Sequence, residues 1–158
     1  MTPTKNNLPE TTRKTVVTLL NARLADVIDL FNQTKQAHWN VKGPTFIALH
    51  ELFDDIAEHV EGYADELAER AVILGGTAEG TTQVVGKRTS LAEYPIDLKN
   101  ARDHVEALSA RLADFAGKTR VAIDESDKAG DKVTADLFTE ITAGVDKDVW
   151  FLEAHLHG

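Results

Sequence analysis

Two pairs of side chains that commonly bind metals lie in one predicted helix, His50 with Asp54 and Asp65 with Glu69. Each pair has i,i+4 spacing, which places its two side chains on one helix face, a turn apart. Asp54 and Asp65 are eleven residues apart, so both pairs face the same side, yet about 16 Å of helix separates them. Because such ligands bind a metal at about 2.0–2.2 Å, each pair is half of a site.

The two pairs are mirrored in the numbering, since 50 and 69, like 54 and 65, add to 119. If two copies of this helix crossed antiparallel about a two-fold axis at the level of His59 and Val60, each His50/Asp54 pair would face a mirrored pair from the second copy. The sequence therefore predicts two metal sites, each built between two subunits.

A fifth candidate ligand, His38, ends the first predicted helix, and the short turn after it brings it near His50. One subunit then supplies two imidazoles and a carboxylate, and the other supplies two carboxylates. This donor set suits a redox-active cation such as Fe(II), and few protein nitrogens leave positions for water and an oxidant. Taken alone, however, either i,i+4 pair is common on solvated helix faces that bind nothing.

Two known metal motifs are incomplete in this sequence. Residues 50–54 resemble the H-E-x-x-H motif of zinc proteases, but the fifth position is Asp rather than His. The Glu-x-x-His motif of bundles that hold two irons within one chain does not occur. A four-helix chain without Glu-x-x-His should not hold the usual site inside its own bundle, which favours a site between subunits.

The elements that must position these residues are predicted to be four long helices. Apolar residues recur at helical spacing in four segments, residues 11–37, 45–74, 96–127 and 131–156. Residues 76–95 are rich in Gly, Thr and Ser and are longer than a usual helix–helix connection, with a short element expected at Gln83-Val84-Val85. A long crossover in the middle of four helices joins parallel neighbours, which predicts an all-α, ferritin-like four-helix bundle.

Three finer expectations follow from the helical pattern. Thr45 should be the N-cap of the second helix. Val121 should belong to the buried stripe of the third helix. Three histidines lack ligand spacing and are predicted to be exposed, namely His104, His155 and His157.

Composition sets the outer bounds. The 158 residues predict one domain, residues 1–158, with residues 1–10 as a flexible tail. The absence of cysteine excludes thiolate metal sites, and the net charge of −9 fits attraction of cations and argues against nucleic acid. The sequence contains no run of eighteen apolar residues, so no membrane span is predicted. The start MTPTKNNLPE has no apolar signal region, so we expect a cytoplasmic protein.

The residues around the ligand pairs form a distinctive series. It begins at Gln36-Ala37-His38-Trp39-Asn40-Val41-Lys42-Gly43-Pro44, passes through both pairs, and reaches Leu74-Gly75-Gly76. It continues at Tyr94-Pro95, Thr134-Ala135-Asp136 and Trp150-Phe151-Leu152-Glu153. This series resembles the Dps family of ferritin-like mini-ferritins over nearly the whole chain.

The resemblance implies a hollow homododecamer that oxidises Fe(II), with hydrogen peroxide in preference to dioxygen, and stores ferric mineral. Because Fe(II) and hydrogen peroxide together generate hydroxyl radicals, consuming both would protect DNA. Trp39 matches an aromatic residue that intercepts radicals or electrons, although a hydrophobic interface residue is an equal interpretation. The ferroxidase ligands implied by the family are His38, His50, Asp54, Asp65 and Glu69. Its acidic three-fold pore for iron is matched by Asp127, Asp131 and Asp136, for which surface acidity is the alternative.

Two other functions stay open. Some Dps proteins bind DNA through basic tails, but here Lys5, Arg13 and Lys14 are offset by Glu10, and residues 153–158 contain no Lys or Arg. We therefore do not expect tight DNA binding or association with the nucleoid, although a structural DNA-compacting protein with secondary metal sites is the runner-up hypothesis. A zinc-holding oligomer is the third hypothesis, after the ferroxidase and the DNA-compacting protein. Zinc usually binds such ligands more tightly than Fe(II) and would compete for them.

Overall fold

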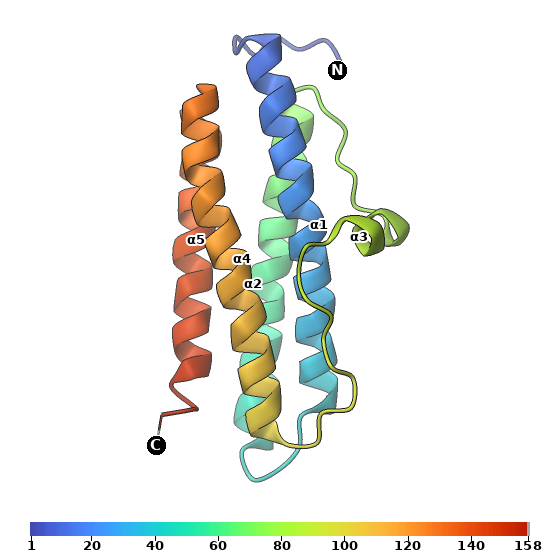
Figure 1. The fold of residues 1–158 in the computed structure, drawn as a ribbon, viewed down its shortest axis with the longest axis vertical. Coiled ribbons are helices and arrows are strands. Elements are labelled where there is room, and N and C mark those ends of the chain that lie inside the picture. The colour runs from blue at the N-terminus through green and yellow to red at the C-terminus, as the bar shows by residue number, and fades with distance from the viewer. Residues whose placement is uncertain (158) are drawn as a thin grey trace.

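Four long helices stand side by side in the computed structural model, which describes residues 1–157 (Figure 1). They are α1 (Glu10–Asn40), α2 (Phe46–Ile73), α4 (Ala101–Ala129) and α5 (Lys132–Glu153), while α3 (Thr82–Arg88) is a short helix in the crossover. The all-α prediction is confirmed, and the expected short element is helical. None of the helices described is long and apolar enough to cross a membrane.

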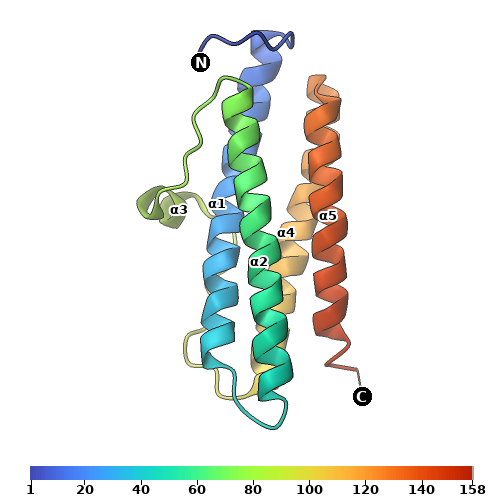
Figure 2. The ribbon, with the colours of Figure 1, turned by 180° about the vertical axis from the view of Figure 1, so that it is seen from behind.

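The chain order of the helices gives the predicted topology. α1 and α2 are antiparallel neighbours joined by a turn in which Gly43 has φ +115°, and α4 and α5 are joined at Gly130, with φ +93°. Both values lie in the left-handed region that glycine adopts without strain. The crossover runs back along the bundle past α1, so α4 lies parallel to α2 (Figures 1 and 2).

The end of α1 and the start of α4 differ from the predicted helix bounds. α1 continues to Asn40, three residues beyond the predicted segment 11–37, so His38 and Trp39 lie within its last turn. α4 begins at Ala101, five residues later than expected, because the side chain of Asn100 accepts a hydrogen bond from the Asp103 amide and caps the helix there. Thr45 occupies the N-cap position of α2, but its side chain makes no capping hydrogen bond.

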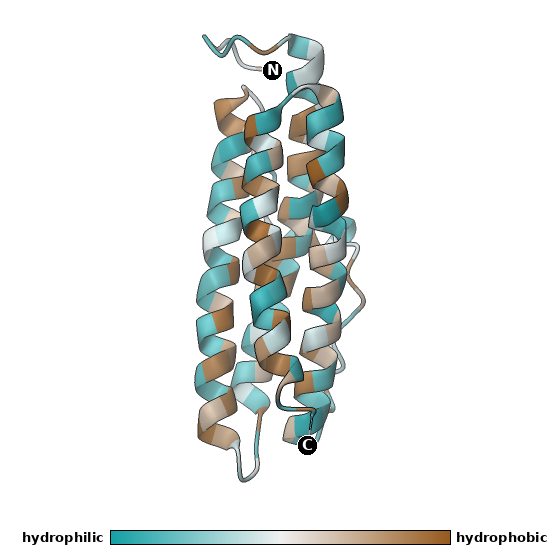
Figure 3. Ribbon diagram, turned by 90° about the vertical axis from the view of Figure 1, so that its left-hand side faces the viewer, coloured by the Kyte–Doolittle hydropathy of each residue, from teal (hydrophilic) through white to brown (hydrophobic). Residues whose placement is uncertain are grey.

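Every long helix is amphipathic, with hydrophobic residues recurring at helical spacing (Figure 3). Two sequence predictions about burial are wrong. Val121 is exposed, because the buried stripe of α4 passes through its neighbour Ala122. His104 is 2% exposed, because it lies on the same stripe as Leu108, and its Nδ1 is 2.7 Å from the hydroxyl of Tyr94. The exposure predicted for His155 and His157 is confirmed.

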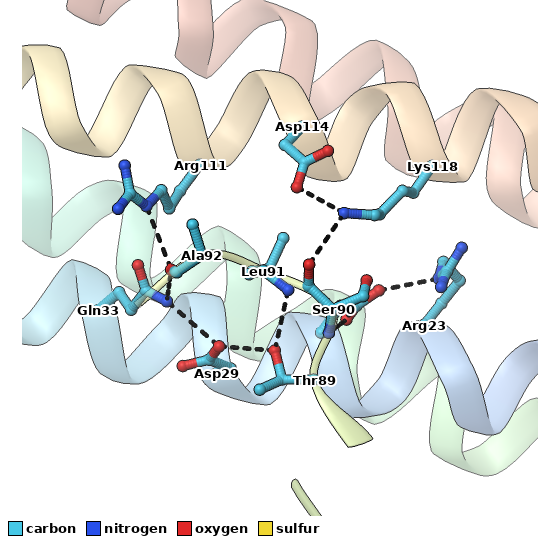
Figure 4. Close-up of polar contacts among 11 residues, drawn as sticks. Arg23, Asp29, Gln33, Thr89, Ser90, Leu91, Ala92, Arg111, Asp114 and Lys118 are labelled. Carbon is cyan, nitrogen blue, oxygen red and sulfur yellow. Dashed lines mark hydrogen bonds and ion pairs between the residues drawn. The ribbon is translucent and has the colours of Figure 1, made fainter. Parts of the chain in front are cut away.

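The crossover is fastened to both helices that it passes (Figure 4). From α1, the fully buried Asp26 accepts hydrogen bonds from the backbone amide and hydroxyl of Ser90, and Asp29 accepts one of 2.6 Å from the hydroxyl of Thr89. From α4, the ammonium of Lys118 donates to the Ser90 carbonyl. Because buried polar groups must find partners, these bonds fix the crossover against α1 and α4.

Candidate metal centre

The end of α1 and the start of α2 hold two histidines face to face. Nδ1 of His38 donates a hydrogen bond of 2.7 Å to the carbonyl of His50, and Nδ1 of His50 donates one of 2.8 Å to the carbonyl of His38. The two rings stack, with centroids 3.8 Å apart and planes 20° from parallel. The reciprocal bonds therefore lock the two rings against each other across the turn.

These bonds also fix which ring nitrogen is free. A carbonyl oxygen only accepts hydrogen bonds, so Nδ1 of each ring must carry the proton. Nε2 of each neutral ring is then left with its lone pair, the arrangement in which histidines bind metals while a backbone group orients them. His38 and His50 could thus each bind a metal ion through Nε2.

Asp54 completes what we call the histidine half-site, made of His38, His50 and Asp54. Its Oδ1 lies 3.9 Å from Nε2 of His38 and accepts a hydrogen bond of 2.6 Å from Nζ of Lys35 on α1. This hydrogen bond lowers the pKa of Asp54 and keeps the carboxylate ionised. Sequence reasoning missed Lys35, although its spacing of three residues from His38 places both on one helix face.

Asp65 and Glu69 form the second group, the carboxylate half-site. Both side chains are exposed on α2, and no hydrogen bond or ion pair engages either one among residues 1–157. The pKa of the neighbouring Glu66 is raised, first by burial and then by the negative charges of Glu140 and Asp65. These charges make the surroundings of the carboxylate half-site negative. The carboxylate half-site thus offers uncommitted anionic oxygens.

The backbone beneath the carboxylate half-site is anchored by a buried ion pair. Arg70, next to Glu69, donates hydrogen bonds of 3.0 Å to both carboxylate oxygens of Asp131 and one of 2.9 Å to the hydroxyl of Thr134. Asp131 also caps α5, where its side chain accepts from the Thr134 amide. Burial alone would raise the pKa of Asp131, but the hydrogen bonds from Thr134 and Arg70 outweigh it and lower that pKa.

This burial corrects one of the pore candidates. Asp131 is 1% exposed and its oxygens are engaged, so in the subunit it is a structural residue rather than a surface ligand. Asp127 and Asp136 are exposed, and Asp127 pairs with Lys132 at 3.0 Å. A pore lined by these two residues stays a prediction. Trp39 is 66% exposed beside the histidine half-site.

The two half-sites do not combine within one chain. Within the described residues, no group of three or more His, Cys, Asp or Glu side chains is arranged to hold a metal ion. His50 and Asp54 lie on the same helix, α2, as Asp65 and Glu69, and eleven residues separate Asp54 from Asp65, so one chain cannot bring the two half-sites together. Their donor types nevertheless fit iron, because free imidazole nitrogens and unpaired carboxylates are the ligands that it takes.

The fold and this donor set define a ferritin-like protein, and residues 17–158 match the family described as "Ferritin-like domain". The chain is 51% identical to the DNA protection during starvation protein of Agrobacterium fabrum, with 97% of this chain and 94% of the relative covered. It is 36% identical to the protein of that name from Brevibacillus brevis, over 89% of this chain and 94% of the relative.

Solved structures agree with these relatives. Mycobacterium smegmatis Dps superimposes with a TM-score of 0.94 at 33% identity, covering 100% of this chain and 95% of the other. Dps from Microbacterium arborescens in the high iron form gives 0.88 at 34% identity, covering 100% and 99%. The chain belongs to the Dps family.

Proposed function

We propose that this protein is a ferroxidase that stores iron: it oxidises Fe(II) with hydrogen peroxide, keeps the ferric product as mineral inside a hollow homododecamer, and so protects DNA. The reciprocal hydrogen bonds of His38 and His50 carry the proposal, because they leave the Nε2 lone pair of each ring free. That one relative is known in a high iron form is consistent with iron as the cargo.

The chemistry needs the second half-site. Two Fe(II) ions each give up one electron, and hydrogen peroxide accepts both, so that its O–O bond breaks and two protons complete two water molecules. The imidazoles bind Fe(II), and the hard, anionic oxygens of Asp65 and Glu69 stabilise the higher charge of Fe(III). Only a second subunit can supply both half-sites to one pair of ions, given their separation along α2.

Exposed apolar residues support the same two-fold pairing. Next to the histidine half-site, Phe46 and Ile47 are 39% and 60% exposed, and next to the carboxylate half-site, Val72 and Ile73 are 56% and 54% exposed. Their numbers pair 46 with 73 and 47 with 72, in the same register of 119 as the ligands. An antiparallel crossing would therefore bury these side chains together, which is a driving force for dimer formation.

The direct test is an anaerobic Fe(II) titration followed by hydrogen peroxide, with oxidation followed by absorbance. We expect saturable binding of two Fe(II) per site and complete oxidation by one peroxide for every two Fe(II). Mass in solution should correspond to twelve chains. Oxidation no faster than in the buffer blank would exclude the ferroxidase function.

The runner-up function, DNA compaction, has less support. Of the three N-terminal cations, Lys14 pairs with Glu10, and Arg13 donates hydrogen bonds to the carbonyls of Leu8 and Leu74. The flexibility of residues 1–10 stays a prediction. Plasmid retarded in a gel at moderate salt would favour this alternative, whereas zinc bound without any iron oxidation would favour the zinc-holding oligomer.

A further inference from the structure

Lys35 reaches from α1 to the metal centre and is not one of its ligands. Its Nζ lies 2.6 Å from Oδ1 of Asp54 and 6.0 Å from the ring centroid of Trp39. The side chain is 23% exposed, whereas Lys14, which pairs with Glu10 near the start of the same helix, is 60% exposed. A partly desolvated ammonium is a stronger electrostatic neighbour than a solvated one.

Metal and ammonium compete for one oxygen. A cation bound through Oδ1 of Asp54 would lie within a few ångströms of Nζ, and the repulsion between the two positive charges would drive the ammonium away from that oxygen. The face of Trp39 offers it a second position, since a cation is attracted to an aromatic ring within about 6 Å of the centroid. Lys35 can therefore leave Asp54 without losing every favourable contact.

The same competition acts more strongly on the product. Carboxylates hold Fe(III) more tightly than Fe(II), so a site that only bound iron would retain its product and stop. Repulsion by the ammonium scales with the charge of the ion and is about one and a half times as strong for a trivalent as for a divalent ion. We propose that Lys35 is a positioning residue that clears the site: it moves aside to admit Fe(II) and returns to Asp54 to release the ferric product. This inference rests on the proposed ferroxidase function.

Binding of a redox-inert metal tests the first half of the inference. In the assembled protein, Lys35→Met should bind Zn²⁺ about 5- to 10-fold more tightly in calorimetry than the wild type, because one repelling charge is gone. Lys35→Arg keeps the charge and should stay within about 2-fold, as should Lys14→Met, which removes a lysine of the same helix far from the site. Lys35→Gln serves as a second uncharged variant if Lys35→Met does not assemble.

Product release tests the second half. After one round of Fe(II) and peroxide, the capacity to bind fresh Fe(II) anaerobically should return about 5-fold more slowly in Lys35→Met than in the wild type. Unchanged zinc affinity, or unchanged recovery, in both uncharged variants overturns the inference while leaving the ferroxidase proposal intact. A wild type that binds neither metal removes the proposed function and this inference with it.

Discussion

Both half-sites draw candidate ligands from α2, to which the end of α1 adds His38, and they are built in opposite ways. In the histidine half-site the side chains themselves are fixed, by reciprocal hydrogen bonds to backbone carbonyls and by ring stacking. In the carboxylate half-site the side chains of Asp65 and Glu69 are exposed, and what is fixed is the backbone, through the ion pair of Arg70 with the buried Asp131. The first is preorganised at its ligand atoms, and the second only at its helix.

This difference suits the proposed oxidation of iron. Imidazole binds through one nitrogen in one direction, so its orientation must be set in advance. A carboxylate can bind through either oxygen and change its mode as the charge of the ion rises, so it gains from freedom at the side chain. The comparison predicts that changes at the two half-sites affect stability and metal binding in different proportions.

Removing the ion pair of Arg70 with Asp131, which anchors the backbone of the carboxylate half-site, should cause the largest loss of stability. Asp131→Ala leaves Arg70 without its partner and α5 without its cap, so unfolding free energy should fall by about 3–5 kcal/mol. Urea denaturation measures the loss. Asp127→Ala breaks an exposed ion pair in the same turn and should change little. If both variants unfolded alike, the anchor would not be the reason for the fixed backbone.

The contribution of Asp131 to stability should also depend on pH. Folding lowers the pKa of Asp131, so its stabilising contribution is complete above the ordinary carboxyl value of 3.8 and is lost as the pH falls through the lowered pKa. The difference in stability between the wild type and Asp131→Ala should therefore narrow at low pH.

Mixing damaged subunits separates the half-sites most directly. His50→Ala or Asp65→Ala alone should weaken metal binding by at least about 100-fold, since even outer partners of metal ligands contribute 10–100-fold. In a two-fold pair of one such subunit with the other, one site is intact and one is doubly damaged. Equal co-assembly should thus restore about a quarter of the tight sites in a calorimetric titration. Absence of any restoration would mean that the sites are not shared.

Much of the arrangement of the two half-sites could be predicted from the sequence. The features that could not be predicted were missed for physical reasons. Helical spacing was enough to pick out the two pairs of candidate ligands on α2 and to separate them into halves, because a helix has one geometry, whereas His38 was added from the short turn between the helices. Lys35 was missed because a contact between two helices depends on their relative rotation, which no single-helix pattern contains. Asp131 was misplaced because an aspartate at a turn looks solvated until Arg70, sixty-one residues away, is brought beside it. His104 was judged by its chemistry, whereas its position on the stripe of α4 decided its burial.

A smaller effect should distinguish the side chains of the two half-sites. His38→Ala removes a buried ring, its hydrogen bond to His50 and the stacking, so unfolding free energy should fall by about 1–3 kcal/mol. Asp65→Ala changes an exposed residue and should stay within about 0.5 kcal/mol. Equal losses in urea denaturation would contradict the claim that only the histidine half-site is fixed at its side chains.

The smallest expected change in stability concerns a second side-chain contact between α2 and α5, at the middle of α2. Midway along α2, between the two half-sites, the contact is made by His59, whose Nδ1 is 3.1 Å from Asp148. Burial raises the pKa of that aspartate despite the opposing effect of His59. A carboxyl with a raised pKa in the folded state costs stability as the pH rises through that pKa, the reverse of Asp131. Asp148→Asn should therefore change stability by less than about 1 kcal/mol at neutral pH, and the wild type should lose ground to it as the pH rises above 3.8. Urea denaturation over a pH series measures both slopes of stability against pH. Slopes of the same sign at Asp131 and Asp148 would contradict the opposite roles given to these two contacts between α2 and α5.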